Sequence, residues 1–228
     1  MYNAGDFKEE VAMSASRPLT RRRFLQIAGV TLAASALTCG GGAALATLPP
    51  QLNFVETHPE GDNSMRRILV AYASKAGSTG EVAQAIGETL SAQGASVEVL
   101  QIKHVKDVDA YQAVIVGSAI RVGNWLPEAV NFVKTHQTEL RQRPTAYFLV
   151  SGFLKDNTPE MVQKVSAYLD PVRALMEPVS TGLFAGKMDY GKLSFLDRTI
   201  AKAVGSVEGD WRNWDAIRAW AAQALPAA

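Results

Sequence analysis

The chain has 228 residues, 47% of them hydrophobic and 20% charged, so it is long enough for one globular domain and additional segments. Its formal net charge is +1, of which residues 1–46 contribute +2 and the remainder −1. A near-neutral body argues against a nucleic-acid-binding surface, which requires a basic face. The single cysteine, Cys39, excludes an internal disulfide. The histidines His58, His104 and His136 lack zinc-ligand spacing, and we interpret them as ordinary surface or loop residues.

The N-terminal region resembles a twin-arginine export signal. Residues 20–26, Thr-Arg-Arg-Arg-Phe-Leu-Gln, place Phe-Leu and a polar residue one position after the pair Arg21 and Arg22. Residues 27–48 follow without a charged side chain, and 22 residues are long enough to span a bilayer as a helix. The glycines at 40–42 and many small residues make this segment only mildly hydrophobic, which favours an export signal over a strong anchor.

Three fates of this signal are open. Residues 44–46, Ala-Leu-Ala, are a candidate cleavage site, Cys39 is a candidate lipidation site, and the segment could also remain as a membrane anchor. Residues 49–66 contain several prolines and no sustained period, so we interpret them as a linker. We expect one folded domain over residues 67–228, outside the cytoplasmic membrane.

Strand and helix patterns alternate through this domain. Predicted strands cover residues 67–74, 96–102, 113–120, 145–153 and 179–185. Predicted helices cover residues 80–93, 127–136, 158–176 (interrupted by Pro171) and 211–225. The alternation predicts an α/β fold with right-handed βαβ units on one parallel sheet and helices on both faces. Five strands fit the doubly wound order 2-1-3-4-5, in which ligands bind at the carboxyl ends of strands 1 and 3.

The first predicted strand runs into a turn of small and hydroxylated residues that opens a helix. The backbone N–H groups of such a turn, together with the helix N-terminus, can hold a phosphate. The turn has neither a Walker pattern nor a Gly-X-Gly-X-X-Gly dinucleotide pattern. A plain glycine-rich βα turn is the alternative. The candidate phosphate-binding residues are Ser74, Lys75, Ala76, Gly77, Ser78 and Thr79.

Residues 72–81, Tyr-Ala-Ser-Lys-Ala-Gly-Ser-Thr-Gly-Glu, resemble the phosphate loop of flavodoxins. In that family a Ser/Thr-X-X-Gly-X-Thr turn binds the phosphate of flavin mononucleotide (FMN), and Ser74, Gly77 and Thr79 fall on the pattern. The resemblance implies a flavodoxin-like three-layer sandwich, non-covalently bound FMN, and electron transfer with a redox partner protein or a quinone. The flavin itself would then carry the redox chemistry, so no catalytic side chain is expected.

The same resemblance implies two loops that contact the flavin ring. The first follows the third strand and comprises Ser118, Ala119, Ile120, Arg121, Val122, Gly123, Asn124 and Trp125. The second follows the fourth strand and comprises Ser151, Gly152 and Phe153. Trp125 could stack on the flavin or pack at the start of the next helix. Arg121 is a candidate partner for a substrate carboxylate or for the negative charge of the reduced flavin.

A narrower resemblance is to the menaquinone-dependent protoporphyrinogen oxidases, a flavodoxin-like branch. It is carried by residues 117–123, Gly-Ser-Ala-Ile-Arg-Val-Gly, by residues 184–191 and 195–198, and by Trp214. It implies quinone-linked porphyrinogen oxidation as an alternative activity. A flavodoxin-fold binding module without flavin is a further alternative, and an absorbance spectrum separates it from the redox proteins.

Two rival classes lack their required residues. A hydrolase would need Gly-X-Ser-X-Gly at a strand–helix elbow, which the chain does not contain. A phospho-receiver would need an Asp at the end of the third strand, where Ser118 stands. Residues 191–206 form an insertion with apolar residues at helical spacing and basic residues between them. We expect a helix there that either contacts a membrane, together with residues 27–48, or packs on the domain surface.

Overall fold

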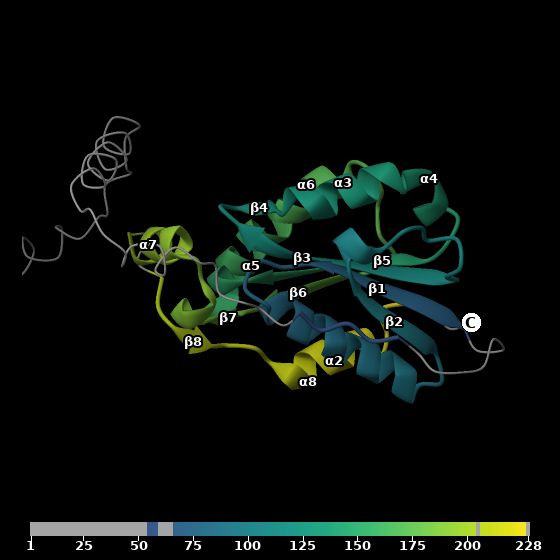
Figure 1. Ribbon diagram of the computed structural model, residues 1–228, viewed down its shortest axis with the longest axis horizontal. Coiled ribbons are helices and arrows are strands. Elements are labelled where there is room, and N and C mark those ends of the chain that lie inside the picture. The colour runs from purple at the N-terminus through teal and green to yellow at the C-terminus, as the bar shows by residue number, and fades with distance from the viewer. Residues whose placement is uncertain (1–53, 59–65, 204–205, 227–228) are drawn as a thin grey trace, which may run out of the picture. The chain divides into compact units, whose positions relative to one another are not determined.

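The computed structural model describes residues 54–58, 66–203 and 206–226 (Figure 1). The chain divides into two units, residues 1–46 and 47–228, and every described residue belongs to the second. The export signal expected at residues 20–48 therefore lies outside the described residues. None of the helices in the described ranges is long and apolar enough to cross a membrane.

A parallel sheet forms the centre of the domain. Its strands are β1 (Arg67–Ala73), β2 (Ser96–Gln101), β3 (Ala113–Arg121), β5 (Thr145–Ser151) and β6 (Thr181–Ala185). They lie side by side in the order β2-β1-β3-β5-β6. Because β4 (Asn124–Trp125) is only a short hairpin strand on β3, this arrangement confirms the predicted 2-1-3-4-5 order. All five carboxyl ends point to one edge of the sheet, which we call the carboxyl edge.

Helices cover both faces of the sheet (Figure 1). Successive side chains of each strand point to opposite faces. On one face Ile68, Val70 and Tyr72 pack against α2 (Ser78–Ala92) and α8 (Trp214–Ala221). On the other, Leu69 and Ala71 share a core with four further helices. These are α3 (Pro127–Thr135), α4 (Gln137–Leu140), α5 (Pro159–Ser166) and α6 (Asp170–Arg173). Burial on both faces explains the unbroken apolar runs of the strands.

A glycine allows β3 and β5 to pack closely in the middle of the sheet. Gly117 lies opposite Phe148 of β5, and a Cβ atom at Gly117 would fall 2.0 Å from the Phe148 ring. The same ring packs against Phe184 and Trp220, each with its centroid 6.4 Å away. A larger residue at 117 would displace this aromatic cluster, in which Trp220 also donates a hydrogen bond to Ser180 just before β6.

Several elements differ in extent from the prediction. The helix predicted over residues 158–176 is broken into α5, a 3₁₀ turn η5 (Ala167–Leu169) and α6, with Pro171 in the first turn of α6. The closing helix begins at Trp214 rather than 211, where the Asn213 side chain caps it by accepting a hydrogen bond from Ala216 N–H at 3.0 Å. Short 3₁₀ turns η3 (Ile102–His104) and η4 (Gly152–Lys155) follow β2 and β5.

The predicted insertion follows β6 and contains the expected helix, α7 (Phe195–Ala203). It is bracketed by two short antiparallel strands, β7 (Lys187–Met188) and β8 (Gly209–Asp210), and includes the turn η6 (Tyr190–Lys192). Residues 54–58, which fall in the expected linker, lie along β2 through a bridge between Thr57 and Val99.

Candidate functional site

The turn between β1 and α2 is the centre of the candidate site. Gly77 is the N-cap of α2 and has a φ of +89°, a left-handed conformation that glycine adopts without steric cost. The Ser74 hydroxyl oxygen accepts a hydrogen bond from Gly77 N–H at 3.0 Å. The Gly77 carbonyl then accepts from Gly80 N–H at 2.9 Å and from Glu81 N–H at 3.2 Å, which starts the helix.

This turn fits a phosphate group. The backbone N–H groups of Ala76, Ser78 and Thr79 make no hydrogen bond to any acceptor among the described residues. They lie at the N-terminus of a 15-residue helix, whose dipole favours a negative charge. A Cβ atom at Gly77 would meet nothing within 4 Å, so the space beside the turn is open.

The side chains of the turn have different roles. The Ser78 hydroxyl accepts a hydrogen bond from Lys187 N–H at 3.0 Å and so holds the insertion against the turn. Thr79 is buried. Lys75 is exposed, and its Nζ lies 3.1 Å from a carboxylate oxygen of Glu128 on α3. The backbone N–H groups and Lys75 are therefore the groups best placed to meet an anion in solution.

The first predicted ring loop is a tight hairpin between β3 and β4. Arg121 pairs with Asn124, and the two residues between them both have positive φ, +50° at Val122 and +74° at Gly123. A β-branched residue is strained in that conformation, and such strain concentrates at functional sites. The Val122 side chain is 86% exposed at the tip of the hairpin.

Two residues predicted for this loop point into the core instead. Ser118 is buried, and its hydroxyl accepts from Leu126 N–H at 2.9 Å and donates to the Ala119 carbonyl at 2.8 Å. Trp125 is 4% exposed and lies edge-on to Tyr147, with ring centroids 5.4 Å apart. Pairing with β3 turns Trp125 inward, so its ring presents no open face for stacking. Both residues therefore connect the hairpin to the buried core.

The second predicted ring loop is the turn η4. Ser151 is buried, and its hydroxyl accepts a hydrogen bond from Phe153 N–H at 3.3 Å. Phe153 is 48% exposed and lies 6.5 Å from the Tyr168 ring. Tyr168 also approaches the first loop, because a Cβ at Gly123 would fall 3.3 Å from it. The structure therefore places Tyr168, which the sequence did not indicate, between the two ring loops.

Ion pairs join the insertion to both parts of the site. Arg121 of the hairpin pairs with Asp197 of α7, and Glu81 in the first turn of α2 pairs with Lys192 at 3.3 Å and with Arg212. Burial alone would raise the pKa of Glu81, but hydrogen bonds and charge from Arg212 and Lys192 outweigh it and lower the pKa. The sequence did not indicate these pairings of Glu81, Asp197 and Arg212, because the paired residues lie 76 or more positions apart.

The remaining groups of the site are the backbone and apolar atoms of the hairpin, with Ala119 and Ile120 half-buried beneath it. Gly152 is open, since a Cβ there would meet nothing within 4 Å. Across the described ranges, no group of His, Cys, Asp and Glu side chains could hold a metal ion. The site thus combines an anion-binding turn with two loops bearing exposed apolar side chains.

The sheet order and the turn after β1 define a doubly wound α/β protein with an open helix N-terminus at its carboxyl edge. The chain belongs to the flavodoxin family, because the model of a flavodoxin domain family matches residues 69–214.

Known proteins with similar sequences carry the name protoporphyrinogen IX dehydrogenase (quinone). The chain is 27% identical to that of Leishmania major, covering 71% of this chain and 77% of the relative. It is 24% identical to that of Escherichia coli strain K12, covering 63% and 81%. Among solved structures, an archaeal flavodoxin is 22% identical with a TM-score of 0.36, covering 61% of this chain and 93% of its own. A Streptococcus pneumonia flavodoxin is 17% identical with a TM-score of 0.43, covering 68% and 94%.

Proposed function

We propose that this chain is a flavodoxin-family redox protein that binds FMN non-covalently and exchanges electrons with a partner protein or a quinone. The observation that carries this proposal is the open N-terminus of α2 at Gly77, next to the two loops that bear exposed Val122 and Phe153. Family membership, shown by the match over residues 69–214, supports the same ligand.

Different residues would bind the phosphate and the ring of FMN. The N–H groups of Ala76, Ser78 and Thr79, with Lys75 nearby, would hold the phosphate. The hairpin around Val122 and the turn around Phe153 would contact the ring. Bound FMN supplies the redox chemistry. The chain's own groups orient the cofactor, and the backbone groups of the loops set its electrostatic environment.

An absorbance spectrum tests the proposal. Full-length protein purified under mild conditions should be yellow, or should become yellow after FMN is added and excess cofactor removed, and its colour should bleach reversibly on reduction. A folded protein that neither carries nor takes up flavin would overturn the proposal and leave a binding module of the same fold.

A second candidate is quinone-linked oxidation of a protoporphyrinogen. It is favoured by the two relatives that carry this name, of which the chain covers 77% and 81%. The test is oxidation of reduced porphyrinogen by the flavin-loaded protein with menaquinone as acceptor. Turnover would establish the oxidase, whereas absence of turnover in a protein with reducible flavin would remove this candidate and favour an electron carrier.

We also propose export by the twin-arginine route, with the domain outside the cytoplasmic membrane and contacts to it through residues 27–48 and 191–206. The pair Arg21 and Arg22 and the uncharged segment behind it support this location, and the route carries proteins that have already folded around a cofactor. Replacing both arginines by lysine should hold the folded protein in the cytoplasm, as cell fractionation would show. Unchanged export of that variant would contradict the proposal.

A further inference from the structure

Residues 54–58 run antiparallel to β2 and close that edge of the sheet. Thr57 N–H donates to the Val99 carbonyl and Val99 N–H donates to the Thr57 carbonyl, both at 3.0 Å. This short segment, which we call the clasp, was expected to be linker. Its backbone pairing covers a strand edge that would otherwise be open.

Side chains reinforce the clasp. The buried Tyr72 donates its hydroxyl to the Val55 carbonyl at 2.7 Å, and burial raises the pKa of Tyr72 to about 12, so it remains a donor at neutral pH. Glu56 accepts a hydrogen bond from Gln101 N–H at 3.2 Å and pairs with His104. The clasp is therefore bonded to both β1 and the end of β2.

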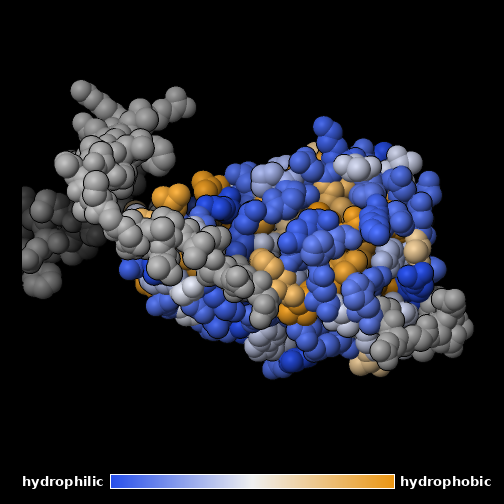
Figure 2. Space-filling view, in the orientation of Figure 1, coloured by the Kyte–Doolittle hydropathy of each residue, from blue (hydrophilic) through white to orange (hydrophobic). Residues whose placement is uncertain are grey.

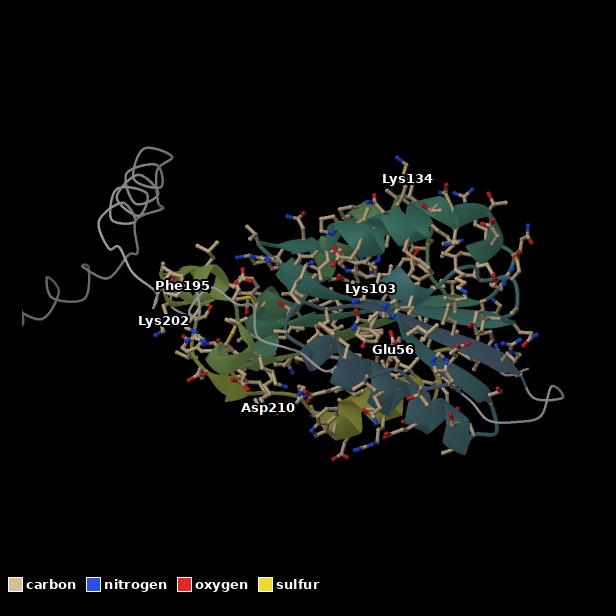
Figure 3. The ribbon with its side chains drawn as sticks, in the orientation of Figure 1. Glu56, Lys103, Lys134, Phe195, Lys202 and Asp210 are labelled. Carbon is tan, nitrogen blue, oxygen red and sulfur yellow. The ribbon has the colours of Figure 1, made fainter. Side chains whose placement is uncertain are left out.

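The order of these contacts fixes the direction in which the chain enters the domain. His58 contacts Glu98 at 2.8 Å, Thr57 pairs with Val99, and Phe54 lies 5.6 Å from the Lys103 ammonium, just past the end of β2. Going backward along the chain, the contacts thus move toward the carboxyl edge. Figure 3 shows Glu56 and Lys103 on this path. Phe54, the first residue of the clasp, therefore lies near the edge that carries the candidate site.

Exposed apolar side chains gather at the same edge. Six large hydrophobic residues are exposed in the described ranges, and five belong to the loops or the insertion at the carboxyl edge. Val122 and Phe153 are the two proposed to contact the flavin ring, and the other three belong to the insertion, where exposed apolar side chains favour an interaction surface. The most exposed are Val122, Leu196 and Phe195, at 86%, 71% and 67%. Figure 2 shows apolar residues at the end where α7 and β4 lie. The ion pair of Arg121 with Asp197 joins the hairpin to α7.

The length of chain outside the described residues indicates what this surface meets. Five residues, 49–53, separate the uncharged segment 27–48 from Phe54. Fully extended, they span at most about 18 Å, whereas release of the clasp would lengthen the tether to about 60 Å. With the clasp closed, an anchor formed by residues 27–48 would keep the carboxyl edge close to the bilayer.

We propose that the carboxyl edge of the sheet is the membrane-facing side of this protein, with the clasp fixing the tether there and Phe195 and Leu196 of α7 entering the bilayer interface. Lys202 on α7 is exposed and adds a positive charge that anionic headgroups attract. The inference rests on the proposed export and on retention of the anchor. This orientation would place the candidate site where lipid-soluble electron acceptors can reach it.

Depth-sensitive fluorescence in vesicles tests the orientation. Full-length Cys39→Ser protein, reconstituted in phosphatidylcholine and phosphatidylglycerol vesicles, would carry one label at Leu196→Cys or, as control, at Val179→Cys before β6. Val179 is 57% exposed at the opposite edge. Nitroxide lipids should quench the label at 196 several-fold more than that at 179. Equal quenching, absence of quenching at both positions, or detachment of the protein from the vesicles would overturn the inference.

Two variants at Thr57 test whether the clasp sets the orientation. Thr57→Pro removes the N–H that bonds the Val99 carbonyl, whereas Thr57→Val keeps it. The quenching ratio between positions 196 and 179 should fall toward one in the proline variant and stay high in the valine variant, and an unchanged ratio in both would contradict the role of the clasp. The flavin spectrum of each sample is the independent readout. Edge-specific quenching without flavin would refute the redox proposal alone, and flavin without edge preference would refute the orientation alone.

Discussion

Gly77 is the residue of the proposed phosphate site that most needs to be glycine, because its φ is positive. Gly94, at the other end of the same helix, is a matched control. Gly77 and Gly94 flank α2 with φ of +89° and +91°, and a Cβ at either would meet nothing within 4 Å. Each replacement by alanine should therefore cost about 1–2 kcal/mol of folding stability through backbone strain alone. Only Gly77→Ala should also weaken FMN binding, because only Gly77 shapes the anion-binding turn. Titration of flavin fluorescence checks this, and equal losses of affinity in both variants would contradict it.

Lys75 tests how much of the binding depends on a formal charge. It is exposed and paired with Glu128, so Lys75→Ala should raise the FMN dissociation constant by at most about fivefold, and less at high salt. Lys134→Ala, on the outer surface of α3 (Figure 3), is the control and should leave affinity unchanged. An unchanged dissociation constant in Lys75→Ala would mean that backbone N–H groups and hydroxyls suffice.

The sequence predicted the structural positions of some site residues better than those of others. Ser74 and Gly77 act through hydrogen bonds within four positions of themselves, so a local pattern was enough to place them. Ser118, predicted for the ring loop, is buried because its hydroxyl bonds to Leu126 and Ala119. Trp125 takes the packed alternative, because its ring lies against Tyr147, a tertiary contact that a local pattern cannot reveal.

Among the elements, the insertion is held in part by one carboxylate that makes two ion pairs. Glu81 bridges Lys192 and Arg212, and its pKa is held below the ordinary value of 4.5. A carboxyl group whose pKa is lowered by folding stabilises the protein fully above that ordinary value, and the contribution is lost as pH falls below it through the lowered pKa.

Glu81→Gln should therefore lower the free energy of unfolding by about 1 kcal/mol at pH 7 and flatten its decline below about pH 4.5. Glu88→Gln, on the same helix and in contact with Gln84, is the matched control. Denaturant unfolding between pH 3 and 7 measures both. A variant at Glu81 whose stability follows the wild-type pH profile would show that the bridge does not hold the insertion.

Element boundaries show where local patterns end and tertiary contacts take over. All five main strands were predicted within two residues of their observed ends, because burial on both faces demands continuous apolar runs. The short strands β4, β7 and β8 have two residues each, too few for any period. The clasp was also missed, because its partners Tyr72, Val99 and Gln101 are 17 to 45 positions away.

At the scale of the whole molecule, every feature of the proposed function meets at the carboxyl edge of the sheet. The turn at Gly77, the two loops and the insertion all lie there, because parallel strands bring their following loops to one edge. The sheet order follows from the alternation of strands and helices. The coupling of the insertion to the turn follows from ion pairs that only the folded structure brings together.

Comparison of FMN with riboflavin tests the central claim most directly. The two ligands share the flavin ring and differ in the phosphate that the turn at Gly77 is proposed to hold. If only two of the three N–H groups at the turn each make a charge-assisted hydrogen bond of about 1.5 kcal/mol, they already correspond to about 100-fold in affinity. Calorimetric titration of the flavin-free protein should therefore show FMN binding about 100-fold more tightly than riboflavin. Equal affinity for the two ligands, or binding of neither, would contradict the account.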